Sequence, residues 1–165
     1  MEKWHQLFIS DVKRRLFEES VPRIKKCLNM LTDEEIWYRP NENTNAIGNL
    51  VLHLNGNVRQ WVLAGVMGEK DIRDRPREFN ERRLLPAADL IALMDLLEAD
   101  VRPALDRLTQ EQLLEDCVVQ NIPETGISAL LHVVEHFSYH VGQITFAVKA
   151  RKDVQTRYYD EESLN

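Results

Sequence analysis

Apolar residues recur every three or four positions along four stretches of the chain, and turn-forming residues separate these stretches. The spacing predicts four helices, over about 2–31, 46–68, 87–108 and 127–150. The stretch RPNENTN, residues 39–45, is rich in turn and cap residues and is predicted to be the loop before the second helix. Four amphipathic helices bury their apolar stripes against one another, so we expect an all-α four-helix protein.

Two prolines fall inside the predicted helices. We expect Pro22 to kink or interrupt the first helix and Pro103 to bend the third. The apolar stripe of the first helix is expected to carry Leu7 into the core. The segment 109–126 is the least periodic part of the chain, and we expect a helical turn there, followed by an extended piece at CVV.

Length and composition narrow the class of protein. A chain of 165 residues is most economically one domain, which we expect to span residues 1–165. The net charge of -6 gives no positive field for phosphate backbones or anionic membranes, so neither nucleic-acid nor membrane binding is expected. The charged N-terminus lacks the apolar core of a signal peptide, and no apolar run approaches the ~20 residues that span a bilayer. Two distant cysteines outside any CxxC pattern fit a reducing compartment, and we expect a cytoplasmic protein.

The last predicted helix carries the sequence HVVEHFSYHVGQI, which groups polar side chains on one side. At about 100° per residue, its three histidines and its glutamine fall within an arc of roughly 80°. These positions are His132, His136, His140 and Gln143. His140 borders the apolar arc of the helix, and His132 lies furthest from it.

The second predicted helix has a similar margin, where His53 and Asn57 flank its apolar arc. If these two helices are neighbours, His53 converges with His136 and His140. Two imidazoles at i and i+4 suit one metal ion, and a third from another helix completes a set of three nitrogens. An ion bound by three neutral imidazoles has open positions for water, thiolate or substrate oxygen. From the residues alone, surface or hydrogen-bonded histidines are an equally good interpretation.

Three segments together resemble a known family. They are RIKKCLNML with WYRPNENTNAIGNLVLHLNGNVRQW, then RDRPREFNER, then LLHVVEHFSYHVGQITFAVK, and they cover nearly the whole chain in this order. The combination resembles the DinB-like superfamily of four-helix metalloproteins and, within it, the DUF1572 branch. The resemblance implies an antiparallel up-down-down-up four-helix bundle, often a homodimer, with a divalent ion bound by His53, His136 and His140. Related members are thiol S-transferases or isomerases that use bacillithiol or mycothiol, and others are described as metal-dependent hydrolases.

We therefore expect a transferase that uses one divalent metal per chain to activate a low-molecular-weight thiol toward a small-molecule substrate. The alternatives are a hydrolase that uses metal-bound water and a metal-binding stress-response protein without turnover. Zinc is the first expectation for the metal. Nickel, manganese and iron also accept imidazole, so the ligand type does not fix the ion.

Four polar side chains near the predicted site have two interpretations each. His132 is a general base, a substrate contact or a fourth ligand, or else a solvated histidine. Gln143 hydrogen-bonds a ligand imidazole or the substrate, or is an amide of the helix core, and Asn57 has the same alternatives. Tyr139 presents its hydroxyl to the site as a substrate contact, or packs against its neighbours.

The segment DIRDRPREFNERR, residues 71–83, contains five arginines and four acidic residues. Its simplest interpretation is a solvated loop with many ion pairs. The alternative is that Arg73, Arg75 or Arg77 reaches the pocket and binds a substrate carboxylate through two parallel hydrogen bonds.

Overall fold

The computed structural model describes residues 3–159, and Glu2, where the first helix was predicted to begin, lies outside them. The chain is mostly helical, and each predicted helix lies in a helical part of it. The first stretch comprises α1 (Lys3–Lys13), the π-helix η1 (Arg14–Ser20) and α2 (Val21–Leu28), followed by α3 (Asp33–Ile36). The others are α4 (Ile47–Val58) with the π-helix η2 (Arg59–Val66), α5 (Arg75–Asn80), α6 (Ala87–Arg107), α7 (Gln110–Leu114) and α8 (Gly126–Lys152).

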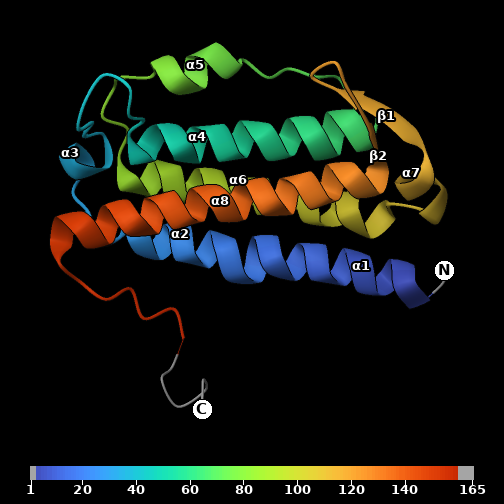
Figure 1. Cartoon of the computed structure of the whole chain (residues 1–165), viewed down its shortest axis with the longest axis horizontal. Helices are drawn as coiled ribbons and strands as arrows, with labels where there is room; N and C mark the ends of the chain where they lie inside the picture. The colour runs from blue at the N-terminus through green and yellow to red at the C-terminus, as the bar shows by residue number, and fades with distance from the viewer. Residues whose placement is uncertain (1–2, 160–165) are drawn as a thin grey trace.

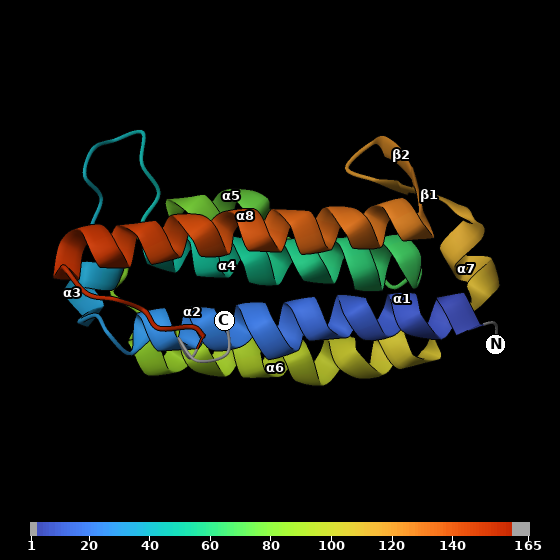
Figure 2. The ribbon, with the colours of Figure 1, turned by 60° about the horizontal axis from the view of Figure 1, so that its bottom comes forward.

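The long helices lie side by side in two layers (Figures 1 and 2). One layer holds α4 and α8, and the other holds α1 with α2 beside α6. Contacts join α4 to α8 and α2 to α6 within the layers, and α2 to α8 and α4 to α6 between them. The short helix α5 crosses over α4 on the outside of the bundle (Figure 1). Because α4 and α8 are neighbours, the polar margins of these two helices face each other.

Proline affects the two helices that contain it differently. The first helical stretch changes type before Pro22, where the π-helix η1 passes into α2. Proline has no N–H to give to the preceding turn, and the wider π turn lies where that bond is lost. The interruption expected at Pro22 is thus a change of helix type. By contrast, α6 continues as a single helix through Pro103.

The aperiodic segment forms a turn of helix and then a β-hairpin. Strand β1 (Asp116–Val119) pairs antiparallel with β2 (Ile122–Thr125), which confirms the extended piece at CVV. The two turn residues, Gln120 and Asn121, both have positive φ, as a two-residue hairpin turn requires. Residues 3–159 therefore contain one β-hairpin in addition to the helices.

The core is continuous between the two layers and consists of apolar residues from every long helix. Leu7 was predicted to join it, and this prediction is wrong, because the residue is 58% exposed. The buried stripe of α1 contains Ile9 and Val12, and Leu7 points about 160° away from Ile9 on the helix. Between residues 3 and 159, no helix has both the length and the apolar character needed to cross a lipid bilayer.

Candidate metal centre

Three imidazoles meet at the contact between α4 and α8. His53 comes from α4, and His136 and His140 come from successive turns of α8. The Nε2 atoms of His53 and His136 lie 2.9 Å apart, and one nitrogen from each of the three rings lies within 4.8 Å of the others. The centroid of the His53 ring is 5.0 Å from that of His136 and 5.1 Å from that of His140. The two helices are neighbours, and the margins that were expected to converge on that condition do converge.

The donor set has the chemistry and the spacing of a divalent metal site. Imidazole nitrogens are ligands that divalent metals accept, and three of them within 4.8 Å of one another could hold one ion. His53 is 5% exposed and His140 is 9% exposed, while His136 is half-buried. Burial, with His140 and His53 as neighbours, lowers the pKa of His136 to about 3, and burial also lowers the pKa of His140. These two imidazoles are thus neutral near pH 7, the form that binds metals.

A carboxylate holds the outer nitrogen of His53. Nδ1 of His53 lies 3.0 Å from Oε2 of Glu78, a residue of α5. Arg73 donates from Nε to Oε1 of Glu78 over 2.7 Å and from Nη2 to Oε2 over 2.8 Å. Burial opposes ionisation of Glu78, but the hydrogen bonds from Arg73 and His53 hold the pKa of its carboxyl below the ordinary value. Nη2 of Arg73 also lies 3.0 Å from Nδ1 of His53 but donates to Glu78 over the shorter 2.8 Å. With the proton on Nδ1, His53 donates to the ionised carboxylate, and Nε2 of this ring has the lone pair that can bind a metal.

The position of α5 over α4 depends on two residues of α4. The buried amide of Asn49 donates to the backbone oxygens of Glu78, over 2.9 Å, and Glu81, over 3.2 Å. Gly56 lies one turn after His53, and a Cβ there would overlap the carboxylate of Glu78. Glycine at this position lets the carboxylate approach the helix closely enough to reach His53.

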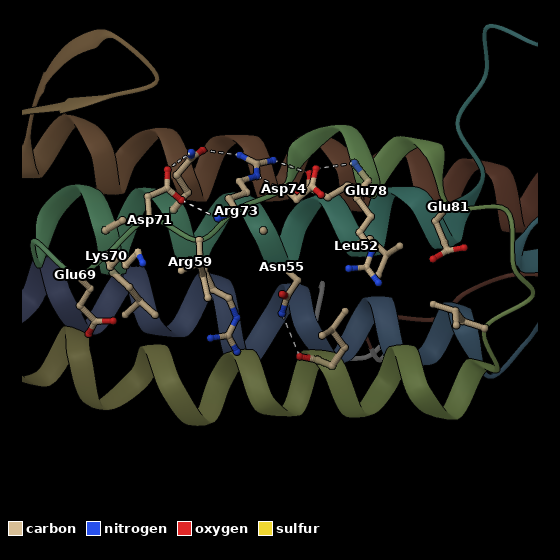
Figure 3. Close-up of a pocket in the computed structure, with 18 of the residues that line it drawn as sticks. Leu52, Asn55, Arg59, Glu69, Lys70, Asp71, Arg73, Asp74, Glu78 and Glu81 are labelled. Atoms are coloured by element: carbon tan, nitrogen blue, oxygen red, sulfur yellow. Dashed lines mark hydrogen bonds and ion pairs between the residues drawn. The ribbon is translucent and has the colours of Figure 1, made fainter.

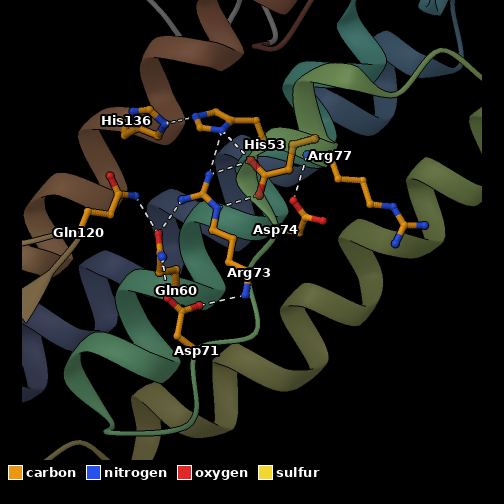
Figure 4. A network of polar contacts seen from close by, with 9 residues as sticks. His53, Gln60, Asp71, Arg73, Asp74, Arg77, Gln120 and His136 are labelled. Atoms are coloured by element: carbon orange, nitrogen blue, oxygen red, sulfur yellow. Dashed lines mark hydrogen bonds and ion pairs between the residues drawn. The ribbon is translucent and has the colours of Figure 1, made fainter.

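Arg73 is the centre of a wider polar network, shown in Figure 4. Its Nη1 donates to Oε1 of Gln60 over 2.8 Å, and Gln60 donates to Asp71 over 2.7 Å. Gln120, in the hairpin turn, donates to the same Gln60 oxygen over 2.7 Å. The side chain of Arg73 is 3% exposed. All these contacts fix the guanidinium beside His53 and Glu78.

A second acceptor orients His140. Its Nδ1 lies 2.7 Å from Oε1 of Gln143, one turn further along α8. An amide oxygen can only accept, so Nδ1 of His140 carries the proton and Nε2 has a free lone pair. Glu78 and Gln143 thus have the same effect on two of the three rings. Each accepts the proton of Nδ1, from His53 or from His140, and so keeps the proton off Nε2 of that ring.

Comparison with known proteins identifies the family. The family model "Protein of unknown function (DUF1572)" matches residues 4–159. The chain belongs to the DUF1572 family. A comparison with curated proteins finds no match.

Solved structures share the fold of this DUF1572 chain at low sequence identity. A DinB-like protein from Bacillus cereus ATCC 10987 has a TM-score of 0.67 at 17% identity, over 85% of this chain and 90% of that one. The DinB-like protein YjoA from Bacillus subtilis has 0.64 at 18%, over 87% and 90%. A conserved protein from Enterococcus faecalis has 0.69 at 17%, over 90% and 97%. This DUF1572 chain therefore has a DinB-like fold.

His132 lies at one end of the histidine cluster in this DUF1572 chain. Its ring stacks on the indole of Trp61, with centroids 3.7 Å apart, and is nearly parallel to His136 at 5.3 Å. Burial lowers the pKa of His132, so its ring is neutral near pH 7. Asn57 of α4 is buried, between His53 and Trp61 of η2 in the sequence, and among residues 3–159 its Oδ1 has no hydrogen-bond partner.

Tyr139 and Arg75 lie at the periphery of the site. Tyr139 is 62% exposed, and the edge of its ring meets His140, with centroids 5.1 Å apart. The guanidinium of Arg75 lies over the ring of Phe79 at 5.0 Å, and that ring in turn packs against His53 at 4.8 Å. Arg73 was one of the arginines considered as a partner for a substrate carboxylate, but its guanidinium donates to the carboxylate of Glu78.

Two cavities border the site. One, of about 540 Å³, lies between α4 and α6 beneath the segment that leads to α5, with Arg73 and Glu78 along its edge (Figure 3). The other, of about 530 Å³, lies on the side of Gln143 and includes Leu50, one turn before His53. The two cavities are thus lined by the residues that hold two of the histidines, Glu78 in the first and Gln143 in the second.

Sequence reasoning missed Glu78, Asn49 and Gly56. Glu78 was counted among the ion pairs of a solvated loop. The sequence NLVLHLNGN holds the signal that could have pointed to Glu78, because Asn49 and Gly56 lie about one turn on either side of His53. A buried amide and a helical glycine beside a candidate ligand indicate that another segment of backbone approaches there.

Proposed function

We propose that this chain binds one divalent metal, with zinc the first candidate, through His53, His136 and His140. We further propose that it is a transferase that activates a low-molecular-weight thiol toward a small electrophile. One observation supports this above all. Three imidazoles from two helices converge, while Glu78 and Gln143 hold the outer nitrogens of two of them. Three protein ligands, rather than four, are typical of a catalytic site with room for a substrate.

The residues of the chain would have separate roles. A divalent ion in this position would supply Lewis acidity that lowers the pKa of a thiol. His132, which is neutral because burial lowers its pKa, would accept the thiol proton. The sulfur then forms a bond to the electrophilic carbon, and the bond from that carbon to the leaving group breaks with its electron pair. Gln143 would orient His140, and Asn57 would donate to or accept from the substrate with its buried amide.

The domain organisation, the order of the helices and the oligomeric state are part of the same proposal. We propose a single domain over residues 1–165 with an up-down-down-up order of helices, as a cytoplasmic homodimer. Figure 1 supports the order, because α1 lies toward the end of the molecule that holds α7, and α2 toward the end that holds α3. The helix α8 follows the hairpin at the α7 end, and α4 follows α3 at the other.

The direct test is thiol-dependent turnover of a general electrophile such as chlorodinitrobenzene, with a panel of small thiols and zinc-loaded protein. The proposal expects turnover above the uncatalysed rate, lost on chelation and in His140→Ala, and restored to the chelated wild type by zinc. Lys149→Gln, on the opposite side of α8, should retain the rate. Rates that survive both chelation and His140→Ala would reject the proposal.

Two other results would favour a different function for this chain. Hydrolysis of ester, amide or lactam substrates without added thiol would favour a metal-dependent hydrolase. Stoichiometric metal without turnover on either panel would favour a metal-binding stress-response protein.

A further inference from the structure

The cavity of about 530 Å³ lies along α4 and α8 next to the histidine cluster, and it is lined by Gln143, the partner of His140. On α8, Gln143 and Ala147 line it, one and two turns after His140. On α4, Leu50 and Ile47 line it, one and two turns before His53. Since the two helices contact each other, the walls of the cavity begin where the cluster ends.

The register of α8 places both sites on one face. With about 100° per residue, Ala147 lies about 20° from His140 on the helix, and Arg151 lies about 20° on the other side. Along the axis, the eleven residues from His140 to Arg151 span about 16 Å. One stripe of α8 thus starts at the imidazoles, passes an apolar wall and ends at a guanidinium that lines the same cavity.

Arg151 presents its charge in a form suited to a ligand. Its guanidinium lies over the ring of Tyr38 at 3.8 Å, and Tyr38 also lines the cavity. Stacking occupies the face of the guanidinium and leaves its N–H groups, which lie in the plane, available to an acceptor. Within residues 3–159, no carboxylate forms an ion pair with Arg151. Glu35, the acidic residue of the cavity wall, is bound by Lys152 through both carboxylate oxygens, at 3.0 and 3.1 Å.

The walls between these ends are largely apolar. Ile47, Leu50, Phe146 and Ala147 contribute them, and Phe146 is 74% exposed. The loop side adds the polar residues Asn43, Thr44 and Asn45. Arg151 attracts Glu35 through its charge but forms no ion pair with it within residues 3–159. Apolar walls select an apolar molecular body, and a stacked arginine whose N–H groups form no ion pair selects a carboxylate.

We infer that this cavity binds the electrophilic substrate, and that the substrate class is a small organic acid with an apolar body. Its carboxylate binds Arg151, and its reactive carbon lies at the end of the cavity beside Gln143 and His140. The assignment of this molecule as the substrate rests on the proposed function. The binding of an apolar carboxylate by Arg151 does not.

An alternative role for Arg151 is to interact with the carboxyl end of α8. Lys149 lies in the same last turn and offers the same charge to the helix dipole. It lies about 180° from His140 on the helix wheel, away from the stripe of the cavity. Lys149→Gln therefore serves as the matched control for Arg151→Gln.

The experiment is a titration of full-length, metal-free protein with octanoate, followed by amide chemical shifts. Octanoate should shift the signals of Ala147 and Ala150, and Arg151→Gln should weaken its binding by about tenfold or more. Lys149→Gln should bind octanoate as the wild type does. The uncharged analogue octanamide should bind the wild type as weakly as octanoate binds Arg151→Gln. Equal affinity of wild type and Arg151→Gln for octanoate would overturn the inference, as would the absence of binding to the wild type.

Because the titration uses metal-free protein, its result does not depend on whether the proposed function is correct. If the wild type binds octanoate through Arg151 but never retains a metal, the proposed function fails and the carboxylate site stands. If the protein retains metal and turns over thiols while Arg151→Gln binds octanoate normally, the proposed function stands and the carboxylate site fails.

Discussion

The contact between α1–α2 and α6 and the contact between α4 and α8 belong to one bundle but have different interiors. In the first, Leu16, Ile24, Leu97 and Leu105 are at most 1% exposed, and the charged pairs lie outside them. In the second, imidazoles and the Asn57 amide occupy the interior. Buried polar groups without full partners lower stability, so the α4–α8 contact holds its polar residues at an energetic cost. The difference teaches that one contact of this fold is built for stability, while the other keeps buried polar groups where the metal site is proposed.

The apolar contact should show the largest effect on stability. Leu97→Ala removes a side chain with 0% exposure and should lower the free energy of unfolding by about 2–5 kcal/mol. Metal content at low temperature should not change, because the site lies in the other contact. The neighbouring Leu96 is 57% exposed, and Leu96→Ala should change stability by less than about 0.5 kcal/mol. Denaturant titration measures both free energies, and equal losses would show that the burial of Leu97 does not stabilise the fold.

The polar contact should respond most in metal affinity. Glu78→Gln weakens the acceptor of the Nδ1 proton of His53 and should lower zinc affinity by about 10–100-fold. Stability should fall as well, because Arg73 then lacks its full charged partner. Glu81→Gln is the matched control, since Glu81 binds Arg83 and not a histidine. Competition with a chromophoric chelator measures the affinities, and an unchanged value in Glu78→Gln would remove Glu78 from the site.

The two contacts should also differ in their response to pH. The folded protein holds the pKa of His136 at about 3, whereas an unfolded histidine titrates near 6.5. Between these values the unfolded chain binds more protons, so the metal-free protein should lose stability as the pH falls from about 6.5. Glu78 adds to the loss below about pH 4.5, because its pKa is also lowered in the fold. Thermal unfolding at pH 7.5, 6.0 and 5.0 tests this, and an equal slope in His136→Gln would contradict the assignment.

The smallest effect should be a gain in stability. Asn57→Leu replaces a buried amide, whose Oδ1 lacks a hydrogen-bond partner within residues 3–159, by an apolar side chain of similar size. The free energy of unfolding should rise by about 1 kcal/mol, because an unsatisfied acceptor is removed. Any thiol-dependent turnover should fall in the same variant. A destabilised Asn57→Leu with full activity would show that Asn57 serves packing.

Periodicity was sufficient to predict the helices. The polar margins of two helices predicted the meeting of His53, His136 and His140 only on the condition that these helices are neighbours, and the family resemblance supplied the set. Their role as ligands remains a prediction. The partners of the cluster were harder to predict, because Glu78 and Arg73 lie in a segment of mixed charge where many pairings are equally good. Which carboxylate reaches His53 is decided by Asn49 and Gly56, through backbone contacts that periodicity does not record. The predicted burial of Leu7 was also wrong, because the first turns of α1 have apolar residues on two faces.

The central claim is that the α4–α8 contact holds a metal, and metal content per chain tests it most directly. Elemental analysis should use protein purified without a histidine tag, as wild type and as His53→Ala, His136→Ala and His140→Ala. His5→Gln, in α1, is the control that removes a histidine outside the cluster. We expect about one metal per chain in the wild type and the control, and a large loss in each of the three alanine variants. A wild type without metal, even after incubation with zinc, would contradict the account.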